Sequence, residues 1–374
     1  MKALTRKFLT YPPKRDILFV LGAGASHPDG VPLQQQILPM IISGDSEQIK
    51  KTRIGQQVIQ FVDDHFLYNQ DTGQFPQLEA VFGFLDYFIQ HKESLSSHYP
   101  NPKIQEIKED LIKIIHYIVD LKTDKPSATY HAFWEAIQRN NTNISIITLN
   151  YDTLLEQAFD FLFQKCGYID YCIHFMNYTK LNEVEEFSFW INPREPIQIS
   201  EDENPVPFKI IKIHGSLNWK YCNCCNQTLL TPWDRKIDLN KGKFLGYTFP
   251  GKQEYEYCCP LDGTEFQTLI MPPSYVKSLE HPVISQLLSE ASREIRVARK
   301  IVFVGYSFSD ADIHMKALFK KHLIGDRELI VVNTRNSESL RLKYCTLSRN
   351  VSFVDCSFEE MVHNDGKLME QIFS

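Results

Sequence analysis

The chain has 374 residues, of which 43% are hydrophobic and 23% charged, a composition typical of a globular protein. Forty basic and forty-six acidic residues give a net charge of −6, which argues against direct nucleic-acid binding, since that usually needs a basic face. No apolar stretch approaches the roughly 18–20 residues that span a bilayer, and the basic N-terminus lacks the apolar core of a secretory signal. We therefore expect a cytoplasmic protein without membrane segments.

The first strong signal is a short apolar run, Asp16–Leu21, which leads directly into Gly22-Ala23-Gly24-Ala25-Ser26. Continuous apolarity over so few residues predicts a strand buried on both faces, and a helix is expected from about Leu33 to Ile42. Glycines after such a strand let the backbone approach a diphosphate, and a following helix N-terminus offers N–H donors. A tight strand-to-helix turn without a ligand would need the same glycines, so both interpretations stay open.

This loop differs from the fingerprint of a dehydrogenase. About 20 residues after its glycines, that fingerprint requires a second strand ending in an acidic residue that holds the ribose. Here the corresponding region is Ile41–Asp45, and the sequence after it has helical periodicity. Hydride transfer is therefore disfavoured.

Residues 45–127 are predicted to form a helical insertion. Apolar residues recur there at spacings of three and four, in one set from Leu78 to Ile89 and in a second from Ile104 to Ile118. We interpret both sets as buried helix faces. The flanking residues, 15–44 and 128–360, are predicted to form the nucleotide-binding core of a single domain that spans 1–374.

The rest of this core alternates helices and buried strands. Strands are predicted at 144–148, 208–213, 300–304, 328–332 and 351–354, and helices at 129–139 and 153–163. Such alternation predicts an α/β fold with a Rossmann-like, doubly wound, mostly parallel sheet. Five of the apolar strands end in a polar or glycine cluster, and ligands of doubly wound sheets bind at the carboxyl ends of the strands.

The order of these strand-end motifs is more specific than any one of them. Gly-Ala-Gly-Ala-Ser at 22–26 is followed by Thr-Leu-Asn-Tyr-Asp at 148–152, Lys-Ile-His-Gly-Ser at 212–216, cysteine pairs between 222 and 259, Gly-Tyr-Ser at 305–307, and Asn333 after a strand. This order resembles the sirtuin family and is most similar to its bacterial sirtuin-like branch. The resemblance covers about residues 15–45 and 128–360.

The resemblance implies that NAD is the substrate, with its diphosphate at the first glycine loop, one phosphate near Ser307 and the adenosine ribose near Asn333. The NAD contacts expected from it are Gly22, Ala23, Gly24, Ser26, Thr148, Gly215, Gly305, Ser307 and Asn333. The catalytic residues expected from it are Asn150, Asp152 and His214.

The chemistry of these side chains suits cleavage of the nicotinamide–ribose bond. Departure of nicotinamide leaves an oxocarbenium-like ribose, and an Asn carbonyl can stabilise that charge or orient the attacking water. A His that titrates near neutrality can deprotonate a ribose hydroxyl or activate the nucleophile. Asp152 also suits the N-cap of the helix that starts at Thr153, and the two roles are compatible.

The part of the site that holds acyl-lysine in deacylating sirtuins is missing. Gly30-Val-Pro is followed by Leu33-Gln-Gln rather than Asp-Phe-Arg, Leu149 stands where a Gln precedes the Asn, and Leu-Ile-Met-Pro-Pro-Ser at 269–274 replaces the acyl-lysine strand. Without an acyl oxygen to capture the ribose, water is the natural acceptor. We therefore expect an NAD+ hydrolase that releases nicotinamide and ADP-ribose. A protein deacylase or ADP-ribosyltransferase, and a non-catalytic NAD or ADP-ribose sensor, are the alternatives.

The resemblance further implies a role in anti-phage defence through NAD depletion. Such an enzyme must be silent at rest, so we expect regulation by homo-oligomerisation or by a separate partner such as a HerA-type ATPase.

Five of the nine cysteines form two tight groups, Cys222-Asn-Cys224-Cys225 and Cys258-Cys259, within a cysteine-rich insertion at 217–268. In a reducing compartment such groups indicate metal ligands rather than disulfides. Two-residue spacings are typical of tetrathiolate zinc sites, and deacylase-like sirtuins have a zinc ribbon here. Cys222, Cys225 and Cys259 are the best ligands, with Cys258, Cys224 or Asp262 as the fourth. A degenerate ribbon that has lost its metal is the alternative.

Overall fold

The computed structural model describes residues 7–43, 47–163, 167–176, 190–191, 197–200, 204–231, 236–247, 254–256, 258–259, 261–277, 279–363 and 367–374. A parallel sheet forms its centre. Every hydrogen-bonded pair of its strands is parallel. In spatial order the strands are β16 (Val351–Asp355), β15 (Glu328–Asn333), β14 (Ala298–Val304), β2 (Arg15–Leu21), β3 (Ile144–Thr148), β7 (Val206–Lys212), β4 (Gly167–Asp170) and β5 (Trp190–Ile191). The prediction of a Rossmann-like, doubly wound sheet is confirmed.

The central strands end at the same level, and this register brings the residues that follow them to one edge of the sheet. Leu21 pairs with Thr148 on one side and with Val304 on the other, Thr148 pairs with Lys212, and Val304 pairs with Val332. The residues after each strand therefore emerge along one edge of the sheet. The chain leaves β2 toward β3 and later returns to the other side of β2 as β14, so the strand order reverses at β2. Ligands of open α/β sheets bind at such a reversal.

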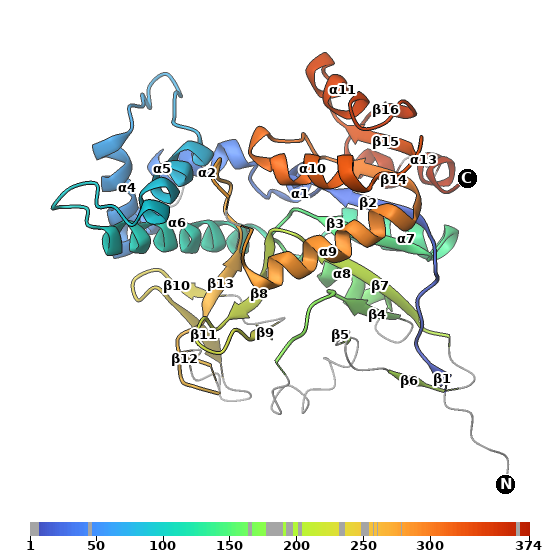
Figure 1. Cartoon of the computed structure of the whole chain (residues 1–374), viewed down its shortest axis with the longest axis horizontal. Coiled ribbons are helices and arrows are strands. Elements are labelled where there is room, and N and C mark those ends of the chain that lie inside the picture. Colours follow the sequence, from blue (N-terminus) through green and yellow to red (C-terminus); the bar gives the residue numbers. More distant parts are fainter. Residues whose placement is uncertain are drawn as a thin grey trace, which may run out of the picture.

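Helices cover both faces of this sheet (Figure 1). One face carries α7 (Ala128–Asn140), α8 (Leu154–Phe163), α12 (Phe358–His363) and α13 (Lys367–Phe373), and the other carries α9 (Pro282–Val297) and α10 (Ile313–His322). The helices predicted at 129–139 and 153–163 are α7 and α8. The helix α9 was not predicted, although its buried residues Val283, Leu287 and Ile295 have helical spacing. The helix α11 (Glu338–Cys345) connects β15 to β16.

The glycine loop after β2 continues as a four-residue helix, α1 (Ala23–Ser26), and a 3₁₀ turn, η1 (His27–Asp29). The longer helix expected near residue 33 follows as α2 (Gln34–Ser43), and Pro39 lies within it. The long helix α2 therefore begins ten residues after Gly24 and not directly at the glycine loop.

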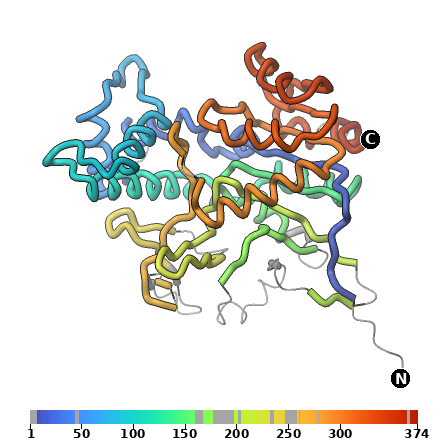
Figure 2. The backbone as a smooth tube through the Cα atoms, viewed as in Figure 1, coloured from blue at the N-terminus to red at the C-terminus, as the bar shows by residue number. Residues whose placement is uncertain are grey.

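A group of helices lies at one end of the molecule, in blue to teal in Figure 2. It comprises α3 (Glu47–Lys51), α4 (Arg53–His65), α5 (Leu78–His91) and α6 (Asn101–Lys122). The helix α6 packs against both α4 and α5 through the apolar faces that the sequence predicts, including Leu78, Leu85, Ile107 and Leu111. In the described part of the chain, no helix is long and apolar enough to cross a membrane.

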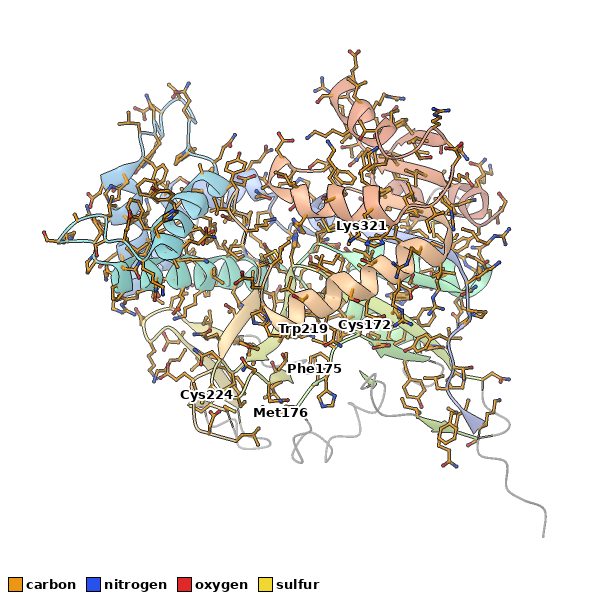
Figure 3. The ribbon with its side chains drawn as sticks, in the orientation of Figure 1. Cys172, Phe175, Met176, Trp219, Cys224 and Lys321 are labelled. Carbon is orange, nitrogen blue, oxygen red and sulfur yellow. The ribbon has the colours of Figure 1, made fainter. Side chains whose placement is uncertain are left out.

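Short antiparallel strands form the region after β7, where the sequence analysis predicts no strands. One sheet has the order β13 (Gln267–Ile270), β8 (Gly215–Tyr221) and β9 (Thr228–Leu230), and a second joins β10 (Ile237–Asp238), β11 (Lys243–Tyr247) and β12 (Glu254–Glu256). Trp219 of β8 packs against Tyr171 and Phe175, with ring centroids 5.3 and 5.9 Å away, and so joins this region to the loop after β4 (Figure 3). A two-stranded ribbon of β1 (Lys7–Phe8) and β6 (Gln198–Ile199) lies near the N-terminus.

Candidate active site

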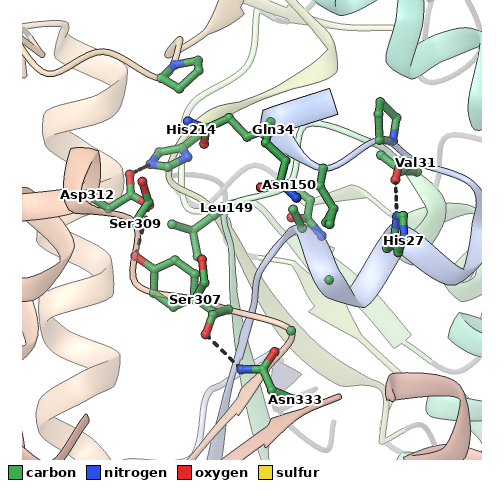
Figure 4. A pocket seen from close by; sticks show the side chains of 18 of the residues that line it. His27, Val31, Gln34, Leu149, Asn150, His214, Ser307, Ser309, Asp312 and Asn333 are labelled. Atoms are coloured by element: carbon green, nitrogen blue, oxygen red, sulfur yellow. Dashed lines mark hydrogen bonds and ion pairs between the residues drawn. The ribbon is translucent and has the colours of Figure 1, made fainter. Parts of the chain in front are cut away.

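A cavity of about 640 Å³ lies at the carboxyl ends of β2, β3, β7, β14 and β15. This volume is within the roughly 300–1,000 Å³ of small-molecule and cofactor sites. Figure 4 shows Asn150, His214, Ser307 and Asn333 around it. The predicted site residues that line it are Ala23, Gly24, Asn150, Asp152, His214, Gly305, Ser307 and Asn333. Residues that lie 310 positions apart in the sequence, Ala23 and Asn333, thus share one cavity.

The two glycine turns at the cavity interlock. Gly24 N–H donates to Gly305 O over 2.9 Å, and Gly22 N–H donates to Val304 O over 2.9 Å. A Cβ built on Gly24 would lie 2.8 Å from Gly305 Cα, and one built on Gly22 would lie 2.6 Å from Gly305 O. Gly305 itself has a φ of +60°, a region that favours glycine. Close contact between the ends of β2 and β14 therefore requires these glycines whether or not a ligand is bound.

The side chain of Asn150 is hydrogen-bonded to the glycine loop after β2. Its amide Nδ2 donates to Gly22 O over 2.9 Å and to Ser26 Oγ over 3.0 Å, and its backbone N–H donates to Thr148 Oγ1. Because the Gly22 carbonyl can only accept, these bonds fix which end of the amide is the NH₂ group. The carbonyl oxygen is then the polar atom that Asn150 can present to a ligand.

Four predicted NAD contacts do not line the cavity. Ser26 is fully buried and its hydroxyl lies 2.9 Å from Tyr130 Oη, so it supports Asn150 from the side away from the cavity. Thr148 supports the same residue through its hydroxyl, and Gly22 through its carbonyl. Gly215 has a φ of +84°, and a Cβ on it would lie 1.8 Å from Leu269 O, so it allows β8 to approach β13 closely. These four residues act on the site through their neighbours.

Asp152 lines the cavity and is also bonded to the start of a helix. Its Oδ1 accepts from Leu154 N–H over 3.1 Å. Because α8 begins at Leu154 and not at Thr153, Asp152 lies one residue before the N-cap position and not at it, as was predicted. Its Oδ2 is buried and has no hydrogen-bond partner among the described residues. The residue is 3% exposed. Oδ1 of Asp152 thus stabilises the start of α8, and Oδ2 is available to a ligand or a water.

His214 belongs to a group of ionisable side chains that the sequence analysis did not predict. Its Nε2 lies 3.2 Å from His314 Nε2 and 3.7 Å from Asp312 Oδ1. Lys277 Nζ lies 2.6 Å from the same Asp312 oxygen, and Tyr306 Oη donates to the other over 3.2 Å. Asp312 and His314 follow Gly305-Tyr306-Ser307 within ten residues, and this Asp-x-His spacing is the signal that could have indicated them.

Burial and Lys277 keep both imidazoles of this group neutral. Burial, then the Lys277 ammonium, lower the pKa of His214 to about 3, although Asp312 opposes them. The same two causes lower the pKa of His314 to about 4. Burial alone would raise the pKa of Asp312, but His214 and Lys277 outweigh it and the pKa is lowered. At neutral pH the group therefore contains two neutral imidazoles and one ammonium–carboxylate pair.

The far end of the cavity is built on β14 and β15. Asn333 lies at the end of β15 and its Nδ2 donates to Tyr306 O over 3.2 Å, while Ser307 is exposed toward the cavity (Figure 4). Lys343 of α11 also lines this end, where its ammonium contacts Phe308 O and Asp310.

The helical group supplies part of the cavity wall. Gln77 and Glu79 at the start of α5 line the cavity, together with Tyr275 from the segment after β13. Tyr275 Oη donates to Gln77 Oε1 over 2.6 Å, and Ser274 Oγ donates to Asp86 Oδ2 over 2.5 Å. On its other side, Met271 N–H donates to His214 O over 2.8 Å. The segment 271–275 is therefore bonded both to the sheet edge and to α5.

Three of the predicted zinc ligands come together near β8. Cys222, Cys225 and Cys259 group with Asp262, and any two of their ligand atoms lie within 4.8 Å. Cys225 Sγ lies 3.7 Å from Cys259 Sγ, which fits the roughly 3.75 Å between sulfurs on a tetrahedral zinc with Zn–S bonds of about 2.3 Å. Cys222 Sγ lies 3.3 Å from Asp262 Oδ2. Cys258 is exposed and lies outside the group, so the geometry replaces it with Asp262, one of the alternatives.

Comparison with known proteins places the chain in a family. Similar solved structures include a mutant Sir2 homologue in complex with 2′-O-acetyl ADP-ribose (14% identity, 96% of this chain and 94% of that chain, TM-score 0.48) and a Sir2 homologue in complex with NAD (13%, 97%, 92% and 0.45). No curated protein sequence matches the chain. A sequence model described as the SIR2-like domain matches residues 144–352, which is more than half of the 374 residues. The chain therefore belongs to the SIR2-like domain family.

Proposed function

We propose that this protein binds NAD in the cavity at the strand ends, cleaves its nicotinamide–ribose bond and transfers the ADP-ribose to water. The observation that carries the proposal is the convergence of Asn150 and His214 on one cavity beside the interlocked glycine turns. The resemblance of the motif order to sirtuins supports NAD as the ligand, and a Sir2 homologue in an NAD complex is among the similar structures.

In this proposal, the bond from nicotinamide nitrogen to the ribose C1′ breaks and its electron pair leaves with nicotinamide. Asn150 orients its carbonyl oxygen toward the positive ribose or the incoming water, because both amide hydrogens are already bonded to the loop. The water oxygen bonds to C1′. Its proton passes to His214, whose neutral imidazole can accept it. Burial and the Lys277 ammonium lower the pKa of His214, so it is a weaker base than the histidine titrating near neutrality that the sequence analysis expects.

The segment 271–275 supports water, rather than an acylated lysine, as the acceptor. The Met271 N–H and O atoms are bonded to His214 and Tyr151, and the Ser274 and Tyr275 hydroxyls are bonded to α5. A peptide strand added here would have to break these bonds. These bonds of the segment favour water over an added peptide strand as the acceptor in this proposal.

The defence role belongs to the same proposal. Depletion of NAD during phage infection, control through a homo-oligomer and a separate HerA-type ATPase partner follow from the family resemblance alone. A structural zinc on Cys222, Cys225, Cys259 and Asp262 is also proposed, since their ligand atoms group together and the Cys225–Cys259 sulfur separation fits a tetrahedral zinc. Such an ion would cross-link the cysteine-rich region without taking part in catalysis.

The direct test is nicotinamide release from NAD by the purified full chain, alone and with a candidate partner, measured by chromatography. Asn150→Ala should lower the rate by about 100- to 1,000-fold, the usual cost of losing one group that stabilises developing charge. Asn140→Ala, at the exposed end of α7, is the matched control and should match the wild type. Equal rates for Asn150→Ala and the wild type would refute the mechanism. Acceleration by an acetylated peptide would instead indicate a deacylase.

A further inference from the structure

Three side chains of metal-ligand type converge on one wall of the cavity. His214 follows β7, Asp312 ends the 3₁₀ turn η3 (Asp310–Asp312), and His314 lies in the first turn of α10. One ligand atom from each lies within 4.8 Å of the other two. His214 and Asp312 are buried and also line the cavity, so a metal there would face the ligand.

The two distances from His214 Nε2 to its neighbours fit a divalent transition metal. Metal–nitrogen bonds of about 2.05 Å to nitrogens that are 3.2 Å apart would enclose an angle of about 100° at the metal. The 3.7 Å between His214 Nε2 and Asp312 Oδ1 corresponds to an angle of about 125° with bonds of about 2.05 and 2.1 Å. Both angles are near tetrahedral. Two histidines and one carboxylate with an open fourth position are a known zinc ligand set.

The ligands are oriented by partners of their own. His214 is hydrogen-bonded to the Leu149 backbone, which leaves Nε2 to face His314. Tyr306 donates to Asp312 Oδ2 over 3.2 Å and leaves Oδ1 on the side of the histidines. Such second bonds hold ligands in place in established metal sites.

Lys277 opposes a metal at this position. Its ammonium lies 2.6 Å from Asp312 Oδ1 and its side chain is 7% exposed, so it already compensates the carboxylate charge. Two cations on one oxygen repel, and a metal must either displace Lys277 or bind weakly beside it. Lys277 is thus expected to control the affinity of the site.

We propose that His214, Asp312 and His314 form a binding site for a zinc-type divalent metal ion, and that Lys277 competes with that ion for Asp312. If the hydrolase proposed above is correct, the ion occupies His214 Nε2, the atom that accepts the proton from water. The metal-bound protein is then inactive, and its activity appears when the metal leaves or Lys277 replaces it.

Zinc stoichiometry tests the site without turnover. The full chain is stripped with a chelator and dialysed against buffered free zinc, and bound metal is counted by mass spectrometry. We expect two zinc ions for the wild type, one for His314→Gln and one for Cys225→Ser, which removes a ligand of the cysteine group. His322→Gln, on the exposed end of the same helix α10, is the matched control and should keep two.

Lys277→Met should change the affinity for zinc in the opposite direction to His314→Gln. Removal of one positive charge next to the metal should tighten the second zinc by about 10- to 100-fold, because the repulsion acts over a few ångströms in a partly buried site. A simple loss of structure would weaken binding instead. Equal zinc counts for the wild type and His314→Gln at every free zinc concentration would overturn the proposal.

Nicotinamide release separates this inference from the proposed function. Zinc should inhibit the wild type and should inhibit His314→Gln far less, each compared with its own metal-free rate. If the wild type binds the second zinc but releases no nicotinamide under any condition, the metal site stands and the hydrolase fails. If the zinc counts are equal while release is robust, the hydrolase stands and the metal site fails.

Discussion

The two ends of the cavity are built in different ways. At the Asn150 end, main-chain atoms of two glycine turns are in direct contact, and the side chain of Asn150 is bonded to that main chain. At the His214 end, four ionisable side chains from three segments balance one another, and they contact one another side chain to side chain. The first end should therefore be sensitive to volume, and the second to charge and pH.

The largest effect is expected from Gly305→Ala, which alters the contact between the glycine turns at the Asn150 end of the cavity. A Cβ at this position would lie 2.4 Å from Ala25 N, and the φ of +60° is strained for alanine. Overpacking and strain together should lower the free energy of unfolding by about 4 kcal/mol, measured by urea denaturation. Gly325→Ala is the control, because its φ is +73° but nothing lies within 4 Å of the added Cβ, so it should lose only about 1 kcal/mol. Equal losses would show that the contact between the turns is unimportant.

A smaller effect, dependent on pH, is expected from His314→Gln at the second end. The folded pKa of His314, about 4, lies below its ordinary value of 6.5. Its contribution to stability is complete above pH 6.5 and decreases as the pH falls toward 4, because the unfolded chain then takes up a proton that the folded chain does not. Without this imidazole, the loss of unfolding free energy between pH 6.5 and 4 should be smaller by about 2 kcal/mol.

Denaturation of the chelated protein at several pH values checks this. The exposed His91→Gln on α5 is the control, and it should keep the wild-type pH dependence. A His314→Gln curve parallel to that of the wild type would mean that the second end does not respond to charge as its geometry indicates.

The smallest effect is expected from Ser26→Ala, which removes one of the two acceptors of the Asn150 amide and a partner of Tyr130. Loss of a buried hydrogen bond should cost about 1 kcal/mol of stability. Asn150 would keep its bond to Gly22 but would be less well oriented, so nicotinamide release should fall several-fold with little change in KM. Tyr130→Phe keeps Ser26 and should alter the rate less. A larger effect of Tyr130→Phe would show that Tyr130, not Ser26, positions Asn150.

The sequence predicts the first end better than the second for a physical reason. The strands β2, β3, β14 and β15 are short apolar runs buried on both faces, so their ends, and with them Gly22 and Asn150, can be located from composition. The partners of His214 come from loops and helix starts: Lys277 follows β13, and His314 opens α10. No periodicity marks such residues, because only the fold brings them to the sheet edge.

The small sheets were missed for a different reason. The strand β8 is fully buried, yet it contains Asn218 and Lys220, which a buried apolar strand would exclude. Asn218 accepts from Ser216 Oγ, and the Lys220 ammonium lies 4.0 Å from the centre of the Phe244 ring. A buried strand whose polar side chains have tertiary partners cannot be recognised from its hydrophobicity alone.

The level strand ends described above have a consequence for how the site can vary. Each strand advances by about 3.3 Å per residue, so deletion of one residue from β3 would retract Asn150 by that distance and turn the strand's side chains to opposite faces. Exchange of the residue that follows a strand leaves the sheet untouched. Natural variants of this protein should therefore differ in the identity of these end residues far more readily than in the number of residues that precede them.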